Sequence, residues 1–567
     1  MKNYKLILGL AAALVSMTGC YDLDVYPEDQ LSTGTFFKTK DHADQAMMGV
    51  YSTMRQAEVF GWQFSYDCLG GIGAGYDNPS LQVIAKGTYT TTDGRVTGKF
   101  QNLYEGIARA NIVLQNVDNC AMDDSYKATI KGEAKFMRAL FYFNLLDFYG
   151  GVPLYDETTI VAQDFMTMLK PRSSAEEVRN FVIKDLDEAA SNLPAEWDEF
   201  NRGRATSGAA TALKGKVLLF NKQYKEAQKC FETVVNSGKY ELYPSYENLF
   251  KPGGDASSEM IFAIQNIGGI GQDFGMPMCF YMGSRASFGS CWNNVMAETK
   301  FVDEYEYKDG RKFDWEEFQP GYTKSAAAKQ AFWYSTPNAA KNKVEKYTEN
   351  LDKILKMYED RDPRMNVSVI LPYTKYKGWV NNKAKVCEFA LVGKSLHEKD
   401  GYIRINANQE SYLWRKFVPE HDMDGALTNR AHTPINFPLI RLADVYLMYA
   451  ECLNENGNQD KAVEYINKVR QRAGIALLND GQEWNNAKTK DEVFERIVHE
   501  RRVELAAEGL SFADMKRWGR LESLNGRIEG FAGKFMYNRS AEKRDYLWPI
   551  PQSEIDINPS LEQNPGW

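Results

Sequence analysis

The sequence predicts a mainly α-helical protein in which helix pairs stack into a repeat scaffold. Residues 437–518 have the apolar spacing of four consecutive amphipathic helices, and similar pairs recur upstream. Residues 240–436 show no long helical periodicity and are rich in glycine, tyrosine, tryptophan and asparagine. We therefore expect a helical scaffold interrupted by one large, irregular, loop-rich insertion that contains short strands.

The helices near the end of the chain have the clearest boundaries. A helix that begins near Arg441 carries apolar residues at three- and four-residue intervals until Asn456-Gly457 ends it. A second helix over 460–473 is expected to end at Gly474 in the left-handed conformation. A third, over 491–507, has acidic residues in its first turn, and a short segment over 510–518 completes the stack.

Upstream segments repeat this pairing. Helices are predicted over 40–58, 103–117, 125–149 and 174–231. The spacing resembles a divergent tetratricopeptide unit of 34 residues, although unrelated helical hairpins remain an alternative. Units counted from Gly208 and from Ala443 match three positions of this repeat, with Gly215, Ala227 and Phe231 in the first unit and Ala450, Ala462 and Ile466 in the second. The small residues among them let paired helices approach closely.

The insertion is predicted to carry binding function. Two of its segments, 260–266 and 364–372, are rich in β-branched or aromatic residues and are expected to be strands. The rest is expected to form loops. Loops held by a rigid scaffold are where binding residues concentrate.

Composition excludes some classes of function. The chain of 567 residues has a formal charge of −8 and no basic block, so we expect no nucleic-acid partner. Its hydrophobic fraction of 44% is sufficient for a globular core.

Seven cysteines follow Cys20. Because their number is odd and their spacing unpaired, neither a disulfide framework nor a zinc knuckle is predicted.

The first twenty residues predict export and lipid attachment. A basic start and an apolar run over 6–15 precede Met17-Thr18-Gly19-Cys20, which resembles the cleavage motif of lipoproteins. We expect a signal peptide over 1–19 and acyl chains on Cys20 that anchor the protein to a membrane. An ordinary secretory signal followed by a chance cysteine is the alternative.

Several motifs resemble the SusD/RagB family of outer-membrane nutrient-binding lipoproteins. They are RLADVYLMYAECLNENG from Arg441, ERRVELAAEGLSFADMKRWG from Glu500, EAKFMRALFYFNLLDFYGGVPL from Glu133 and the closing QNPGW. The resemblance implies one SusD-like domain over 20–567, with a helical part over 20–239, the insertion over 240–436 and a second helical part with the tail over 437–567. It also implies a lipid-anchored protein on the outer membrane, facing the exterior, that captures glycan and passes it to a SusC-like TonB-dependent transporter.

No motif indicates catalysis. The sequence contains no HExxH pair, no GxSxG elbow and no Walker loop, so we expect a non-enzymatic protein without cofactor or metal. The charges of ERRVELAAEG are interpreted as ion pairs rather than a catalytic cluster. Four alternatives stay open: capture of peptide or glycopeptide, a glycoside hydrolase with an unrecognised carboxylate pair, a structural adaptor, and a calcium site at Asp422 and Asp424.

Two stretches have the composition of a sugar platform, 62–78 and 281–294. Sugar rings stack their C–H faces on aromatic side chains, and their hydroxyls pair with short polar groups. We predict Trp292 as the principal stacking residue, although a core position for this ring is the alternative. The other predicted contacts are the rings Tyr281 and Phe288 and the hydroxyl partners Asp67, Asp77 and Asn78.

Overall fold

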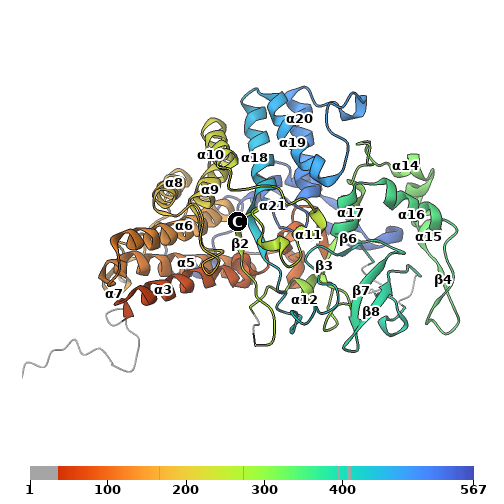
Figure 1. The fold of residues 1–567 in the computed structure, drawn as a ribbon, viewed down its shortest axis with the longest axis horizontal. Coiled ribbons are helices and arrows are strands. Elements are labelled where there is room, and N and C mark those ends of the chain that lie inside the picture. Colours follow the sequence, from red (N-terminus) through yellow and green to blue (C-terminus); the bar gives the residue numbers. More distant parts are fainter. Residues whose placement is uncertain (1–35, 165–166, 272–273, 393–395, 405–409) are drawn as a thin grey trace, which may run out of the picture.

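The computed structural model describes residues 36–164, 167–271, 274–392, 396–404 and 410–567. The predicted signal peptide and Cys20 lie outside the described residues. Helices dominate the described chain, and strands occur only in small pairs (Figure 1). The predicted mainly α-helical fold is therefore confirmed.

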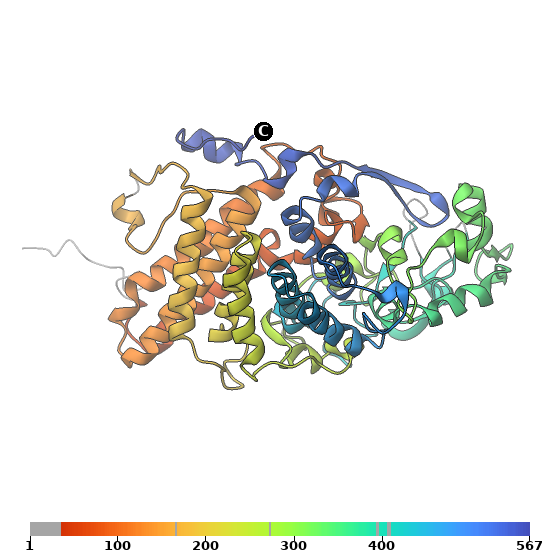
Figure 2. The same cartoon turned by 90° about the horizontal axis from the view of Figure 1, so that it is seen from above.

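Six helices form one side of the molecule, drawn in red to yellow at the left of Figures 1 and 2. Their starts carry the expected capping groups. Asp93 accepts a hydrogen bond from the Arg95 backbone N–H at 2.9 Å, and Ser174 and Glu177 cap each other reciprocally. The helices are α3 (Lys40–Ser52), α5 (Gly94–Asn116), α6 (Asp124–Tyr149), α8 (Ala175–Asn192), α9 (Ser207–Phe220) and α10 (Tyr224–Asn236).

A second helical group continues this stack from the other end of the chain. It comprises α18 (Leu442–Glu455), α19 (Gln459–Ala473), α20 (Lys490–Glu504) and α21 (Ser511–Arg517). Helix α18 packs against α10, so the two predicted repeat units are neighbours in space although the insertion separates them (Figure 1). Gly474 ends α19 with φ 74°, as predicted.

The close helix approach inferred from Gly215 is also present. A Cβ atom at this position would lie 2.7 Å from the Phe231 ring, which is fully buried. Glycine at 215 thus lets α9 and α10 pack at a distance that a side chain would prevent.

The described strands form six antiparallel pairs. One of them, β2 with β10, brings Ile264 opposite Phe437, so the chain leaves the helical stack and rejoins it at the same place. The pairs are β1 (Gly73–Gly75) with β3 (Val295–Ala297), β2 (Met260–Ile264) with β10 (Phe437–Arg441), β4 (Thr336–Pro337) with β5 (Val344–Lys346), β6 (Val369–Ile370) with β9 (Leu413–Trp414), β7 (Lys375–Val380) with β8 (Lys383–Glu388), and β11 (Gly526–Glu529) with β12 (Phe535–Arg539).

The remaining described chain contains shorter α-helices among 3-10 turns and loops. They are α4 (Gln82–Ala85), α7 (Val161–Asp164), α11 (Tyr246–Leu249), α12 (Met278–Met282), α13 (Thr299–Asp303), α14 (Trp315–Phe318), α15 (Ala326–Trp333), α16 (Leu351–Asp360), α17 (Pro363–Ser368) and α22 (Gln552–Ile557).

Two boundary predictions need correction. The strand predicted over 364–372 begins as the helix α17, because Asp362 caps it and Pro363 occupies its first position; only Val369–Ile370 is a strand. The helix predicted over 40–58 ends at Ser52, and a 3-10 turn and a π-helical turn follow.

The charged residues of the segment ERRVELAAEG, at the end of α20 and just beyond it, lie in the core. Glu504 is fully buried and accepts a hydrogen bond from Arg441 at 2.8 Å, while Arg441 also donates to Glu508 at 2.8 Å. Arg364 donates to Glu504 at 3.0 Å. Buried charges are tolerated only when they are paired. The ion-pair interpretation of ERRVELAAEG is confirmed, and the pairs lie inside the molecule rather than on a solvated face.

The closing QNPGW block fastens the end of the chain to the first helices. Asn564 donates its side-chain amide to the carbonyls of Tyr149 and Trp548, at 3.0 and 2.7 Å. Trp548 is buried against Phe148 with ring centroids 4.7 Å apart. This block therefore has a structural role.

Candidate ligand-binding site

The structure brings the two predicted platform stretches together. Strand β1 lies within the stretch 62–78 and pairs with β3, which directly follows the stretch 281–294. Gly75 thus lies opposite Val295. A Cβ atom at Gly75 would lie 1.9 Å from the carbonyl oxygen of Asn294. Only glycine permits this approach. Tyr76 reinforces it, because its hydroxyl donates a hydrogen bond to the carbonyl of Trp292.

Four aromatic side chains form a continuous row, which we call the ring row: Trp62, Tyr281, Phe280 and Trp292. Successive ring centroids lie 4.8, 4.9 and 4.9 Å apart, the distances of favourable aromatic pairs. Trp292 ends the row and is 42% exposed, which excludes the alternative that it is a core residue. Tyr281 lies within the row and is half-buried.

Two guanidinium groups contact aromatic rings of the ring row. Arg95 lies 3.6 Å from the centroid of Trp62, and Arg430 lies 4.5 Å from that of Phe280. Arg430 is fixed by donating to the carbonyls of Gly289 and Ser290, both at 2.6 Å. These contacts hold the rings in place before a ligand binds. Little conformational entropy is therefore lost on binding.

The predicted polar partners fall into two groups. Asp77 and Asn78 are exposed directly after Tyr76, beside the ring row, and Asn78 Oδ1 accepts a hydrogen bond from Arg95 Nε at 3.1 Å. Asp67, by contrast, is completely buried. The prediction that Asp67 pairs with sugar hydroxyls is therefore corrected.

Local structure explains the burial of Asp67. It belongs to the 3-10 helix η3 (Gln63–Cys68), which packs beneath α21. Burial raises the pKa of its carboxyl to about 7. The peptide groups of Gly509 and Ser511 lower this pKa, but burial has the larger effect. A side chain without exposed surface cannot contact a ligand on the outside of this fold.

Phe288 lies apart from the ring row. It is half-buried, contacts Trp379 with ring centroids 5.9 Å apart, and covers the small buried cluster of Cys279, Cys291 and Leu427. The structure therefore brings together Trp292, Tyr281, Asp77 and Asn78 and separates Asp67 and Phe288 from them.

Sequence reasoning missed four contributors: Trp62, Phe280, Arg95 and Arg430. Trp62 lies in a stretch that was singled out, and Phe280 directly precedes Tyr281, so aromatic composition alone was a usable signal for both. Arg95 and Arg430 come from α5 and from the loop before β10. Nothing local in the sequence distinguishes them from other arginines.

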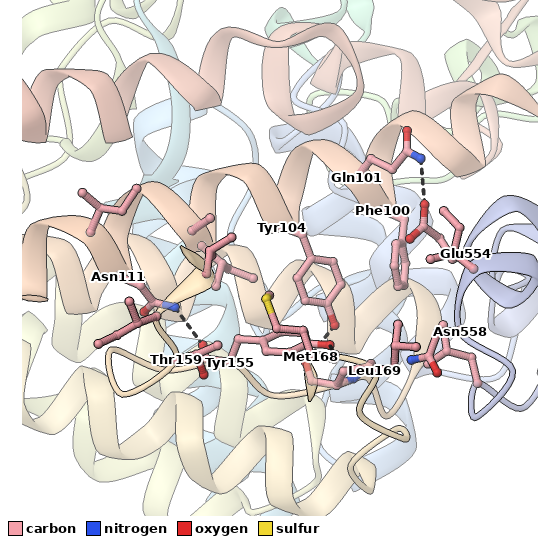
Figure 3. A pocket seen from close by; sticks show the side chains of 18 of the residues that line it. Phe100, Gln101, Tyr104, Asn111, Tyr155, Thr159, Met168, Leu169, Glu554 and Asn558 are labelled. Atoms are coloured by element: carbon pink, nitrogen blue, oxygen red, sulfur yellow. Dashed lines mark hydrogen bonds between the residues drawn. The ribbon is translucent and has the colours of Figure 1, made fainter. Parts of the chain in front are cut away.

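A cavity of about 740 Å³ lies elsewhere, between α5, residues 153–161 and 168–169, and α22 (Figure 3). Its walls are mostly apolar, and its amides already have protein partners. Asn111 donates to the Tyr155 carbonyl at 3.0 Å and Gln101 donates to Glu554 at 2.7 Å, as Figure 3 shows. A hydroxyl-rich ligand would have to break these bonds. The ring row therefore remains the better candidate for a sugar.

Across the part of the chain that the structure describes, no group of three acidic, histidine or cysteine side chains is arranged to hold a metal ion. Asp422 and Asp424 thus lack a third ligand of these types in the described residues. Among the described residues, no helix combines the length and the apolar character that crossing a membrane requires.

Comparisons with known proteins agree along almost the whole chain. Residues 258–567 match the model of the SusD family, and residues 23–219 match a model described as starch-binding associating with outer membrane. The chain is 26% identical to SusD-like protein P25 of Formosa agariphila, covering 95% of this chain and 94% of that protein. It is 22% identical to the starch-binding protein SusD of Bacteroides thetaiotaomicron, covering 98% and 90%.

A solved structure shows the same fold. The crystal structure of a SusD-like carbohydrate-binding protein from Bacteroides fragilis superposes with a TM-score of 0.75 at 22% identity. The match covers 93% of this chain and all of that chain, 100%. The fold is thus shared across the full length of that structure.

Proposed function

The chain belongs to the SusD family, and from this premise we propose that it binds oligosaccharide or polysaccharide at the ring row and delivers it to a TonB-dependent outer-membrane transporter. The observation that carries the proposal is the convergence of 62–78 and 281–294 through β1 and β3, which leaves Trp292 exposed at the end of a supported row of rings.

The chemistry of the ring row suits a sugar. The exposed face of Trp292 offers stacking to the C–H face of a pyranose, and Asp77 and Asn78 offer a hydroxyl acceptor and an amide beside it. The relatives named for starch and carbohydrate binding support this ligand class.

We propose binding without catalysis. Glycoside hydrolysis requires two carboxyl groups that flank one bond. Of the four predicted site residues that the structure brings together, Asp77 alone has a carboxylate.

Native affinity electrophoresis through gels that contain a panel of glycans tests this function. We expect retardation by at least one glycan without release of shorter products. Release of products would indicate a hydrolase, and unretarded migration in every gel would favour a peptide-binding protein or an adaptor.

The anchor and the transporter are separate parts of the proposal. The lipoprotein motif supports anchoring through Cys20 with the protein facing the exterior, and family membership supports a SusC-like partner. We expect Cys20→Ala to lose acylation and to leave the membrane fraction. Extraction of wild-type protein in detergent should copurify a TonB-dependent barrel. Retained acylation, or elution of the protein alone, would contradict the respective part.

A further inference from the structure

We propose that Cys279 and Cys291 form a disulfide in the exported protein, and that this bond locks the two segments that present the ring row. The two sulfur atoms are 3.5 Å apart, and both side chains are completely buried. The pair forms a cluster of its own with Leu427, separate from the main core and covered by Phe288 and Met423.

The backbone already holds the two cysteines next to each other. The Cys291 N–H donates to the carbonyl of Ser284 at 3.0 Å, and the Trp292 N–H donates to the carbonyl of Phe280 at 3.0 Å. A disulfide requires two backbones that approach closely and two sulfurs about 2.05 Å apart. The sulfur atoms are 3.5 Å apart, so closing the bond requires them to approach by about 1.5 Å.

The position of the pair connects it to the ring row. Cys279 directly precedes Phe280 and Tyr281, and Cys291 directly precedes Trp292. Two of the four rings, Phe280 and Trp292, are therefore adjacent in sequence to a cysteine of the pair, and Tyr281 is one residue further along. A bond between the cysteines fixes the spacing of Phe280 and Trp292, whose ring centroids are 4.9 Å apart. The effect on ligand binding rests on the proposed function, whereas the bond itself does not.

The bond forms by thiol–disulfide exchange. The two thiols lose two protons and two electrons, and the disulfide of a thiol oxidoreductase outside the cytoplasm is reduced to a dithiol. The contact with Cys291 and the burial of the site raise the pKa of Cys279 well above its ordinary value. Since the thiolate is the reacting species, the exchange occurs during folding, before the cluster closes.

Peptide mapping tests the bond directly. Full-length protein from cell envelopes is denatured in guanidinium chloride with N-ethylmaleimide and no reductant, then digested with trypsin. Arg285 lies between the two cysteines, so the digest contains two peptides that stay joined only through a disulfide. We expect the joined pair without maleimide on either cysteine. Maleimide on both Cys279 and Cys291 overturns the proposal, whatever the result of glycan binding.

A pair of variants tests the role of the bond. The double variant Cys279→Ser/Cys291→Ser is expected to melt at a lower temperature and to bind the retarding glycan at least roughly threefold more weakly, because ordering of the loop then opposes binding. Cys120→Ser, a buried cysteine in another part of the molecule, serves as the control and should retain wild-type affinity. Wild-type affinity in the double variant would overturn the locking role. A joined peptide pair in a protein that binds no glycan would instead contradict only the proposed function.

Discussion

At Gly215 the absence of a side chain determines how two helices pack. A methyl group would meet the Phe231 ring at 2.7 Å, inside the contact distance of carbon atoms. We expect Gly215→Ala to destabilise the protein by roughly 1–3 kcal/mol, because overpacking forces α9 and α10 apart. Thermal unfolding measures the loss. Gly94→Ala, in open space on α5, is the control, and an equal change in both variants would contradict the packing argument.

Asp67 provides a residue-scale prediction on pH. Its pKa is raised by burial to about 7, above the value of about 3.9 in an unfolded chain. The folded protein therefore binds the proton more tightly than the unfolded chain does. It follows that this residue makes stability fall as pH rises from about 4 to about 7.

We expect Asp67→Asn, which imitates the protonated acid, to remove this part of the pH dependence. Relative to wild type, the variant should gain stability between pH 4 and pH 7 and change no further above it. Denaturant unfolding at several pH values measures the difference. A difference that is constant across this range would mean that Asp67 is charged in the fold.

At the scale of elements, the buried ion pairs join α20 to β10 and α17. Burial raises the pKa of Glu504, but the guanidinium groups of Arg472, Arg441 and Arg364 outweigh it and lower the pKa to about 2. A carboxyl with a lowered pKa stabilises the fold above its unfolded pKa of about 4.3 and loses that contribution as pH falls toward 2.

We expect Glu504→Gln to destabilise the protein at pH 7 by roughly 3–5 kcal/mol, because three cations then lose a buried partner. The deficit should shrink as pH falls from about 4 to about 2. Glu495→Gln removes an exposed partner of Arg520 and should change stability by less than about 1 kcal/mol. Equal losses in the two variants would contradict the importance of burial.

Helices were more predictable from sequence than strands. The apolar spacing of α18 and α19 and the capping residues Ser174 and Glu177 are local signals, and the structure follows them. The segment 364–372 was wrong at its start because β-branched composition was given more weight than Asp362-Pro363, which begins a helix. The capping signal of Asp362-Pro363 was present in the sequence, but the β-branched residues that follow it obscured it.

The candidate site was predictable only in part for a physical reason. Aromatic composition located 62–78 and 281–294, but burial depends on what packs above a segment. Helix α21 covers Asp67, and the distant residues Arg95 and Arg430 reach the rings through tertiary contacts. Such long-range packing leaves no pattern in the neighbouring sequence.

At the scale of the whole molecule, the helical stack positions the site. The chain leaves the stack after β2 and returns at β10, and the residues between them meet the segment after α3 where β1 pairs with β3. The tail from Trp548 onward ties the first helices to the end of the chain. The site itself is built from two segments that are far apart in the sequence, 62–78 and 281–294.

The central claim is that the exposed ring of Trp292 binds glycan. Its truncation should remove stacking while costing little stability, because a ring that is 42% exposed contributes less packing than a core tryptophan. Trp484 is 43% exposed, lies on the 3-10 helix η10 (Glu483–Asn485) and contacts Asp309 and Arg311 rather than the ring row, so Trp484→Ala is a matched control.

Calorimetric titration of Trp292→Ala with the glycan that retards the wild-type protein, together with its melting temperature, tests this claim most directly. A central aromatic contact that supplies about 2 kcal/mol corresponds to an affinity loss of roughly 30-fold. We predict a loss of at least that size in Trp292→Ala, with a melting temperature close to that of Trp484→Ala, which should bind like wild type. Wild-type affinity in a stable Trp292→Ala variant would contradict the account.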